Sequence, residues 1–222
     1  MRASERRRQI RELLERDGRV DVGALHTRFR VSEMTIRRDL AWLEVRGYAV
    51  RTYGGAVAAR GSTAEPSYRA KLGDRRAEKQ AIARAAAELI EDGEAVLLDA
   101  GTTTGAMLPY LRSRKLTVIT NAPEFVSALL DAPAVTLILI GGVVRARSVA
   151  CVGSLATDAL SKLSPDVCVL GVDGLDPERG LTIPDPVEAE IKRAMLLASR
   201  RRIVVADSSK LGHRSLVSFG GI

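Results

Sequence analysis

The 222 residues predict an α/β chain in two parts, a small helical module ending in a β-hairpin and a larger domain with a mainly parallel sheet. Three observations lead to this prediction. Residues 20–57 have the spacing of short amphipathic helices followed by a glycine-tipped hairpin. From residue 77 onward, short apolar runs alternate with segments of helical spacing, as in parallel sheets covered on both faces. Residues 58–76 are polar and loosely patterned, so we expect a linker between domains 1–57 and 77–222.

The bulk composition places the chain among ordinary globular proteins. Hydrophobic residues make up 46% and charged residues 27% of the sequence. No apolar run approaches the roughly 18 residues that a membrane span needs, and the N-terminus lacks the apolar segment of a secretory signal. Cys151 and Cys168 have no further cysteine or histidine at metal-ligand spacing. We therefore expect a cytoplasmic protein with no membrane partner, no metal site and no cofactor.

The positive charge is concentrated in the first quarter of the chain. Residues 1–60 contain 14 Arg, no Lys and 8 Asp or Glu, so they carry +6 of the formal net charge of +7. A concentrated positive field suits contacts with the phosphates of a nucleic acid. A charged, solvated surface has the same composition, so the charge alone does not separate these two explanations.

The first module is predicted to hold three helices, each with a polar residue at its start. Ser4 is expected to cap the first helix, which runs to about residue 16, while Asp21 and Ser32 are expected to cap the second and third. The third helix carries apolar residues at i, i+4 and i+7, which predicts one buried face; these are Ile36, Leu40 and Leu43. Trp42, late in this helix, is expected to pack rather than to read bases.

The outer face of the third helix is predicted to bind DNA. Its start presents threonine and paired arginine side chains, which suit the base edges and phosphates of a major groove. The hairpin after Gly47 reads as a wing, with glycines for a tight turn and Arg51 able to reach a phosphate. A helical module that binds protein is the alternative, but the charge and the outward arginines favour DNA. The predicted DNA-binding residues are Ser32, Thr35, Arg37, Arg38, Arg51, Gly54 and Gly55.

The second domain is predicted to alternate strands with helices. The expected strands are 95–98, 116–120, 135–140, 167–172 and 203–206, and the expected helices are 77–91, 105–112, 124–130, 154–163 and 187–200. Polar residues gather where these strands end. Because the carboxyl ends of parallel strands face one crevice, we expect a ligand site there.

The residues of this expected crevice suit a phosphorylated ligand. Threonine hydroxyls and backbone amides at a helix start bind anions, Lys210 adds a positive charge, and Asp99 or Asp173 suits sugar hydroxyls. Glu188 and Lys192 are also counted as candidates, although a spacing of four is typical of a surface helix pair. The candidate effector-binding residues are Asp99, Gly101, Thr102, Thr103, Thr104, Thr120, Asn121, Gly141, Gly142, Asp173, Glu188, Lys192 and Lys210.

Both parts of the chain resemble one family. The stretch VSEMTIRRDLAWLEVRGYAVRTYGGA resembles the winged helix-turn-helix signature of DeoR-family transcriptional regulators. The segments EKQAIARAAAELIEDGEAVLLDAGTTT, VITNA, LIGGVVR, EAEIKRAM and VVADSSKLG resemble the effector domain of that family, which is related to the ribose-5-phosphate isomerase fold. The resemblance implies a homo-oligomeric repressor of sugar-metabolism genes, either a dimer or a larger assembly, whose affinity for operator DNA is controlled by a phosphorylated sugar.

One departure from the family concerns the end of the chain. The resemblance implies at least one further strand and helix after the loop that contains Lys210, whereas this chain ends soon afterwards at SLVSFGGI. If that element is missing, the parallel sheet is expected to have an unprotected edge.

Two other functions are alternatives to regulation. A sugar-phosphate isomerase with a DNA-binding head could use Asp99, Asp173 or Glu188 as a general base, but the sequence offers no clear acid–base pair. We therefore expect no catalytic residues. A dinucleotide sensor is the weaker alternative, since Gly101 and Gly105 do not have the spacing of a dinucleotide-binding loop.

Overall fold

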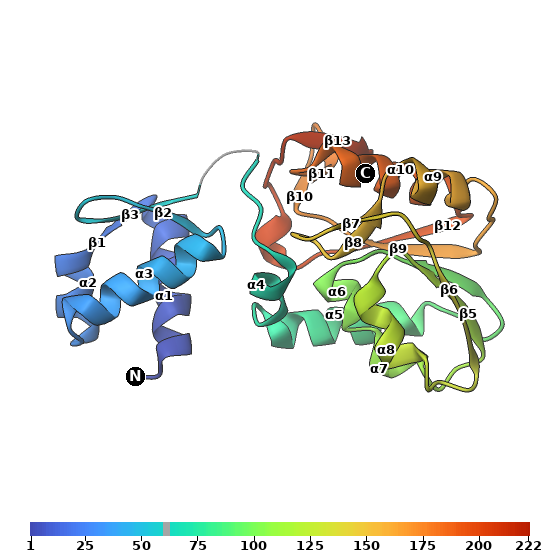
Figure 1. The fold of residues 1–222 in the computed structure, drawn as a ribbon, viewed down its shortest axis with the longest axis horizontal. Coiled ribbons are helices and arrows are strands. Elements are labelled where there is room, and N and C mark those ends of the chain that lie inside the picture. The colour runs from blue at the N-terminus through green and yellow to red at the C-terminus, as the bar shows by residue number, and fades with distance from the viewer. Residues whose placement is uncertain (60–62) are drawn as a thin grey trace. The chain divides into compact units, whose positions relative to one another are not determined.

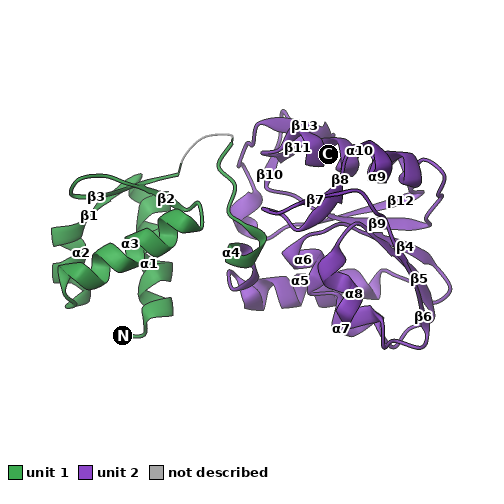
Figure 2. Ribbon diagram, viewed as in Figure 1, with its two compact units in different colours: residues 1–70 green, residues 71–222 purple. Residues whose placement is uncertain are grey.

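The computed structural model describes residues 1–59 and 63–222, which form two compact units. Unit 1 comprises residues 1–70 and unit 2 residues 71–222 (Figure 2). Residues 60–62 of the predicted linker lie outside the described residues.

Unit 1 contains the three predicted helices and a small sheet (Figure 1). The helices are α1 (Ala3–Asp17), α2 (Val22–Phe29) and α3 (Glu33–Val45). The Asp21 side chain accepts a hydrogen bond from the Ala24 amide at 3.1 Å, and the Ser32 hydroxyl accepts one from the Thr35 amide at 3.2 Å. Both predicted caps are therefore confirmed. The predicted Ser4 cap is wrong, because α1 begins at Ala3 and Arg2 is its N-cap residue.

The hairpin is completed by a strand that the sequence did not reveal. The strands β2 (Ala49–Arg51) and β3 (Gly55–Ala58) pair antiparallel, and β1 (Arg19–Asp21) pairs with the other side of β3. Gly54 lies in the turn between β2 and β3, Gly55 begins β3, and neither glycine adopts the left-handed backbone. A Cβ on Gly55 would lie 2.0 Å from the Val20 carbonyl oxygen. Glycine is needed there because β1 approaches closely.

Unit 1 has its own apolar core. The buried face of α3, with Ile36, Leu40 and Leu43, packs with α1 residues Ile10 and Leu14. Trp42 lies at the edge of this core and is partly buried, as expected. The core fixes α3 against α1, so the opposite face of α3 is left to solvent.

Unit 2 is built on a five-stranded parallel sheet with strand order β12-β9-β4-β5-β6 (Figure 1). These strands confirm the predicted parallel sheet; they are β4 (Ala95–Leu98), β5 (Leu116–Thr120), β6 (Val135–Leu139), β9 (Val167–Gly171) and β12 (Arg201–Val205). The helical elements are α5 (Arg76–Glu88), α6 (Thr102–Gly105), α7 (Leu108–Leu111), η1 (Pro123–Phe125), α8 (Val126–Leu129), α9 (Ser154–Leu160), α10 (Pro186–Ala198) and η2 (Ser208–Lys210).

The sheet is buried on both faces by alternating side chains. On β4, Val96 and Leu98 belong to the core shared with α5, α7 and α8, whereas Leu97 belongs to the core shared with α9 and α10. This two-residue period explains why the strands read as continuous apolar runs. The sheet therefore forms the central layer of unit 2, and its carboxyl ends carry the loops of interest.

Smaller elements of unit 2 were not predicted. A short helix, α4 (Tyr68–Leu72), spans the boundary between the units. The strands β7 (Val143–Arg145) and β8 (Ala150–Val152) form a hairpin, while β10 (Gly174–Asp176), β11 (Gly180–Ile183) and β13 (Val217–Gly220) form an antiparallel sheet. The last strand thus joins this small sheet, and β12 and β6 are the outer strands of the parallel sheet.

Candidate functional site

The exposed face of α3 carries the arginines that the sequence predicted to bind DNA. Ser32, Arg37 and Arg38 are exposed and Thr35 is half-buried. Arg37 forms an exposed ion pair with Glu33, 3.3 Å away and one turn earlier. Within residues 1–59 and 63–222, Arg38 has no hydrogen bond or ion pair. Arg38 is therefore the side chain of α3 that is best placed to contact an incoming polyanion.

A buried ion cluster fixes α3 against α1. Asp39 is 1% exposed and accepts one hydrogen bond from Arg6 Nε and one from Arg7 Nε, each at 2.6 Å. Sequence reasoning did not identify this role. The available signal was an acidic residue on the apolar face of the helix, between Ile36 and Leu40, where an unpaired charge is costly.

Two arginine side chains also lie against Trp42. The Arg46 guanidinium lies 3.8 Å and the Arg7 guanidinium 4.8 Å from the centre of a Trp42 ring. Arg7 thus contacts both Asp39 and Trp42, so the ion cluster and the cation–π contacts share one side chain.

The wing residue Arg51 is held by α3. Its Nε donates to Glu44 at 2.6 Å, and its backbone amide donates to the same carboxylate at 3.1 Å. The side-chain hydrogen bond from Arg51 lowers the pKa of Glu44. Gly54, at the tip of the hairpin, is exposed and Gly55 is buried. The predicted contact of Arg51 with a phosphate stays a prediction.

In unit 2, the loop after β4 presents a buried carboxylate. Asp99 is 2% exposed and accepts a hydrogen bond from the Gly171 amide at 3.0 Å and another from Lys192 Nζ. Lys192 also donates to the Gly171 carbonyl oxygen at 2.9 Å. Asp99 Oδ1 is buried without a hydrogen-bond partner. An unsatisfied buried acceptor of this kind suits a hydroxyl donor from a ligand.

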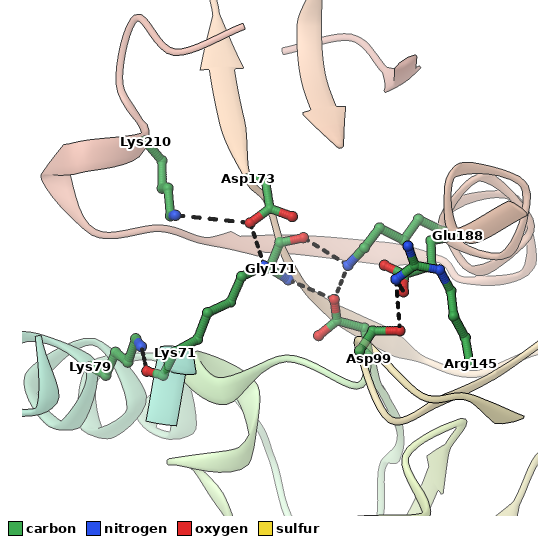
Figure 3. A network of polar contacts seen from close by, with 10 residues as sticks. Lys71, Lys79, Asp99, Arg145, Gly171, Asp173, Glu188 and Lys210 are labelled. Atoms are coloured by element: carbon green, nitrogen blue, oxygen red, sulfur yellow. Dashed lines mark hydrogen bonds and ion pairs between the residues drawn. The ribbon is translucent and has the colours of Figure 1, made fainter. Parts of the chain in front are cut away.

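A second carboxylate, Asp173, follows β9 and is surrounded by ammonium groups. Lys71 Nζ lies 2.7 Å and Lys210 Nζ 3.9 Å from Asp173 Oδ1 (Figure 3). Burial raises the pKa of Asp173, but Lys71 and Lys210 outweigh it and lower this pKa to about 2. Since the folded-state pKa is below the ordinary 3.8, this carboxylate stabilises unit 2 above pH 3.8, and the contribution is lost as the pH falls towards 2.

A buried lysine completes this group of charges. Lys79 on α5 is 7% exposed, and its Nζ donates to the Lys71 carbonyl oxygen at 2.5 Å. Burial lowers the pKa of Lys79 from 10.5 to about 8. The Lys210 and Lys71 ammonium groups lower it further, while Asp74 and Asp207 oppose the shift. Lys79 thus holds its charge at neutral pH only at a cost in stability.

The Lys79→Met variant is expected to be more stable than the wild type at pH 7, by about 1 kcal/mol after solvent screening and the lost hydrogen bond are allowed for. In the wild type the folded-state pKa of Lys79 is depressed to about 8. The destabilisation by this buried charge is therefore complete below pH 8 and decreases as the pH rises towards 10.5. Thermal melts of both proteins at pH 7 and pH 10 test this. If the two proteins differ in melting temperature by the same amount at pH 7 and pH 10, the prediction is contradicted. The control is Lys115→Met, which replaces an exposed lysine.

The threonines after Asp99 have unequal roles. The Thr104 hydroxyl is fully buried, donates to the Asp99 carbonyl oxygen at 2.8 Å and accepts from the Gly101 amide at 3.0 Å. Thr103 is buried and Thr102 half-buried. Their helix, α6, has only four residues and hence a weak dipole, so any anion here depends more on the lysines than on the helix start.

The residues after β5 and β6 mainly support the backbone. The Thr120 hydroxyl accepts from the Ala122 amide at 3.1 Å, and Asn121 Nδ2 donates to the Cys151 carbonyl oxygen at 3.0 Å. Asn121 Oδ1 is buried without a hydrogen-bond partner, like Asp99 Oδ1. Gly141 is exposed, and a Cβ on Gly142 would lie 2.7 Å from the Val152 carbonyl oxygen. Close packing against β8 is therefore sufficient to explain the glycine at position 142, and no ligand contact is needed.

Glu188 and Lys192 are not a surface pair, because both are buried and contact other elements. Glu188 accepts from Arg145 Nη1 at 3.0 Å (Figure 3), and Lys192, one turn later on α10, contacts Asp99. Arg145 also contacts Asp185 at 3.0 Å. The structure thus brings Asp99, Asp173, Glu188, Lys192 and Lys210 into one polar network, to which Lys71, Lys79 and Arg145 must be added.

The three added residues were missed for a common reason. Lys71 lies in the stretch predicted to be a linker, Lys79 on a helix rich in charge, and Arg145 in an unpredicted hairpin. In each case the sequence looks like a solvated surface. Within the described residues there is no cluster of three or more histidine, cysteine or acidic side chains arranged to hold a metal ion. No helix in the same residues has the length and apolarity to cross a membrane.

Comparisons with known proteins match both units. A model of the DeoR-like helix-turn-helix domain matches residues 6–61, and a model of the DeoR C-terminal sensor domain matches residues 74–222. A candidate aga operon transcriptional repressor of Escherichia coli O157:H7 is 41% identical over 216 residues, which are 96% of this chain and 80% of that protein. The glycerol-3-phosphate regulon repressor of Escherichia coli K12 is 34% identical over 227 residues, covering 100% of this chain and 88% of that protein.

Among solved structures, ribose 5-phosphate isomerase A from Methanocaldococcus jannaschii aligns with a TM-score of 0.46 at 16% identity. The alignment covers 62% of this chain and 55% of the isomerase.

Proposed function

The chain belongs to the DeoR family of DNA-binding transcriptional regulators, and from this premise we propose that it represses sugar-metabolism genes under the control of a phosphorylated sugar. The glycerol-3-phosphate regulon repressor and the aga operon regulator named above support this choice of genes. In this proposal α3 and the wing bind operator DNA, and the polar network of unit 2 binds the effector. The protein then works in the cytoplasm as a regulator without catalytic turnover.

One observation carries the proposal for the effector. At the carboxyl ends of β4 and β9, Lys192 contacts the buried carboxylate of Asp99, and Lys71 and Lys210 contact the half-buried carboxylate of Asp173 (Figure 3). A fourth lysine, Lys79, donates to the Lys71 carbonyl oxygen. The ammonium groups suit the phosphate, while Asp99 Oδ1 and Asn121 Oδ1 are acceptors for sugar hydroxyls. A phosphate and a polyol within one small molecule match these two kinds of group.

A panel of sugars and their phosphates, screened by thermal shift, tests the proposal. We expect phosphorylated sugars to raise the melting temperature of unit 2 and the parent sugars to leave it unchanged. The best ligand is then added to an operator-binding assay, where it should change the affinity for DNA. Turnover of ribose 5-phosphate by the purified protein contradicts the regulatory proposal and favours an isomerase with a DNA-binding head.

Lys210→Ala is expected to weaken the effector response about tenfold while operator affinity without effector stays unchanged. The ammonium group lies in unit 2 beside Asp173, and a charge-assisted hydrogen bond to phosphate contributes roughly 1.5 kcal/mol. Titration of the effector into the protein–operator complex measures the response, with Lys162→Ala as the exposed control. Equal loss of DNA binding and effector response points instead to a folding defect.

We also propose that the protein acts as a homodimer or a larger homo-oligomer. A helix-turn-helix reads a few base pairs, and two copies on a palindromic operator multiply the contacts. Light scattering of the full chain with and without operator DNA tests this, and a monomer on DNA contradicts it.

A further inference from the structure

Lys71 is a site residue that lies between the two regions matched by the family models. Those regions are residues 6–61 and 74–222, whereas α4 spans Tyr68–Leu72. Nevertheless, Lys71 Nζ donates to Asp173 at 2.7 Å (Figure 3). The segment that leads from unit 1 to the sensor domain therefore contributes a charged group to the polar network.

Unit 2 holds α4 through both the side chain and the backbone of Lys71. The side chain contacts Asp173 on the loop after β9, and the carbonyl oxygen accepts from Lys79 Nζ at 2.5 Å. The only residue of α4 that is fully buried is Ala70, whose amide is capped by the Ser67 hydroxyl at 3.3 Å. With so little apolar burial, the polar contacts of Lys71 contribute to the attachment of α4.

Three lysine ammonium groups gather beside Asp173. Lys71 Nζ lies 2.7 Å and Lys210 Nζ 3.9 Å from the same carboxylate oxygen of Asp173, and Lys79 Nζ donates to the Lys71 carbonyl oxygen. The carboxylates of Asp74 and Asp207 partly offset these charges. A phosphate monoester carries a charge of about −1.5 to −2 at pH 7, and its oxygens can accept hydrogen bonds from several ammonium groups at once.

We propose that Lys71 binds the phosphate group of the effector together with Lys79 and Lys210, and that the bound phosphate fastens α4 to unit 2. This inference rests on the proposed function and adds the route by which the occupied site acts on the segment that leads to the DNA-binding unit. Without an anion, the three ammonium groups repel one another, and this repulsion contributes to the lowered pKa of Lys79. A phosphate removes the repulsion and offers each lysine an acceptor, so α4 is held more firmly when the site is occupied.

The test uses the full-length protein, its Lys71→Met variant and inorganic phosphate as the probe. Calorimetry measures phosphate affinity, and hydrogen exchange measures protection of the amides of residues 68–72, with sodium chloride at equal ionic strength as the reference. In the wild type we expect phosphate to slow exchange in α4 several-fold. In Lys71→Met we expect affinity to fall about tenfold, and exchange in α4 to stay fast even when phosphate saturates the site.

Two further variants separate this role from a merely structural one. Arg69→Met removes an exposed positive charge from the same helix and is expected to behave as the wild type. Lys71→Arg keeps the charge and is expected to restore most of the phosphate-dependent protection. Melting curves establish that each variant is folded.

The outcomes distinguish this inference from the proposed function. If wild type and Lys71→Met bind phosphate equally, Lys71 is not a ligand and the inference is overturned while the proposed function stands. If Lys71→Met binds weakly but saturating phosphate still slows exchange in α4, the fastening role is overturned. If the wild type binds neither inorganic phosphate nor any phosphorylated sugar of the panel, the proposed function fails and the inference fails with it.

Discussion

Replacing Asp39 with alanine is expected to destabilise unit 1 by about 3 to 5 kcal/mol and to weaken specific DNA binding. Asp39 is 1% exposed and is the shared partner of Arg6 and Arg7, each at 2.6 Å. Arg6 is itself only 6% exposed, so the variant leaves a buried guanidinium without its carboxylate. Breaking a buried ion pair by removing one partner costs about 3 to 5 kcal/mol.

That loss is large for a domain of this size. A unit of 70 residues is stabilised by roughly 4 to 10 kcal/mol, so one substitution removes a large share of the total. Hydrogen exchange of the α1 and α3 amides in the full chain measures the loss. Glu12→Ala, which breaks an exposed pair with Arg8, is the control and is expected to cost less than 1 kcal/mol. If Asp39→Ala and Glu12→Ala show the same protection, the ion cluster does not hold α3 in place.

Arg38→Ala is expected to weaken operator binding roughly 5- to 150-fold without affecting the stability of unit 1. Arg38 is exposed on α3 and has no partner in the described part of the chain, so its loss costs the fold nothing measurable. An arginine that contacts a guanine edge contributes about 1 to 3 kcal/mol of discrimination, which corresponds to this range.

Titration of the same operator at several salt concentrations tests the role of Arg38. Arg8→Ala removes the same charge from α1, where Glu5 and Glu12 already compensate it, and serves as the matched control. If Arg38 reads bases, the variant loses discrimination between operator and random DNA; if Arg38 contacts a phosphate, affinity falls for both and the salt dependence becomes weaker. Unchanged affinity for both kinds of DNA rules out α3 as the recognition helix.

The architecture could be predicted where each segment carries its own physical signal. The five strands of the parallel sheet are buried on both faces and therefore appear as apolar runs, and α2 and α3 begin at side chains that satisfy their free amides. The strands β1, β7, β8 and β10 have three residues each, too few to show a period. Their positions are set by their partners, which the local sequence does not reveal.

Part of the candidate site could also be predicted from local sequence. The rest could not, because it depends on contacts between residues that lie far apart in the chain. Asp99 and Asp173 stand directly after buried strands, so their place at one edge of the sheet follows from strand direction. Lys71 pairs with Asp173 across 102 positions of sequence, and Lys192 with Asp99 across 93. A lysine in a polar stretch has the same local sequence whether it is solvated or paired with a buried carboxylate.

Trp42, which lies against Arg7 and Arg46, is an intrinsic fluorescent probe of unit 1. It is the sole tryptophan of the 222 residues, and it lies on the helix that carries Arg37 and Arg38. Excitation at its absorption edge therefore gives emission from unit 1 alone, whatever unit 2 contributes to circular dichroism. The unfolding of unit 1 can thus be followed separately from that of unit 2 in one sample, with no dye attached and no residue replaced.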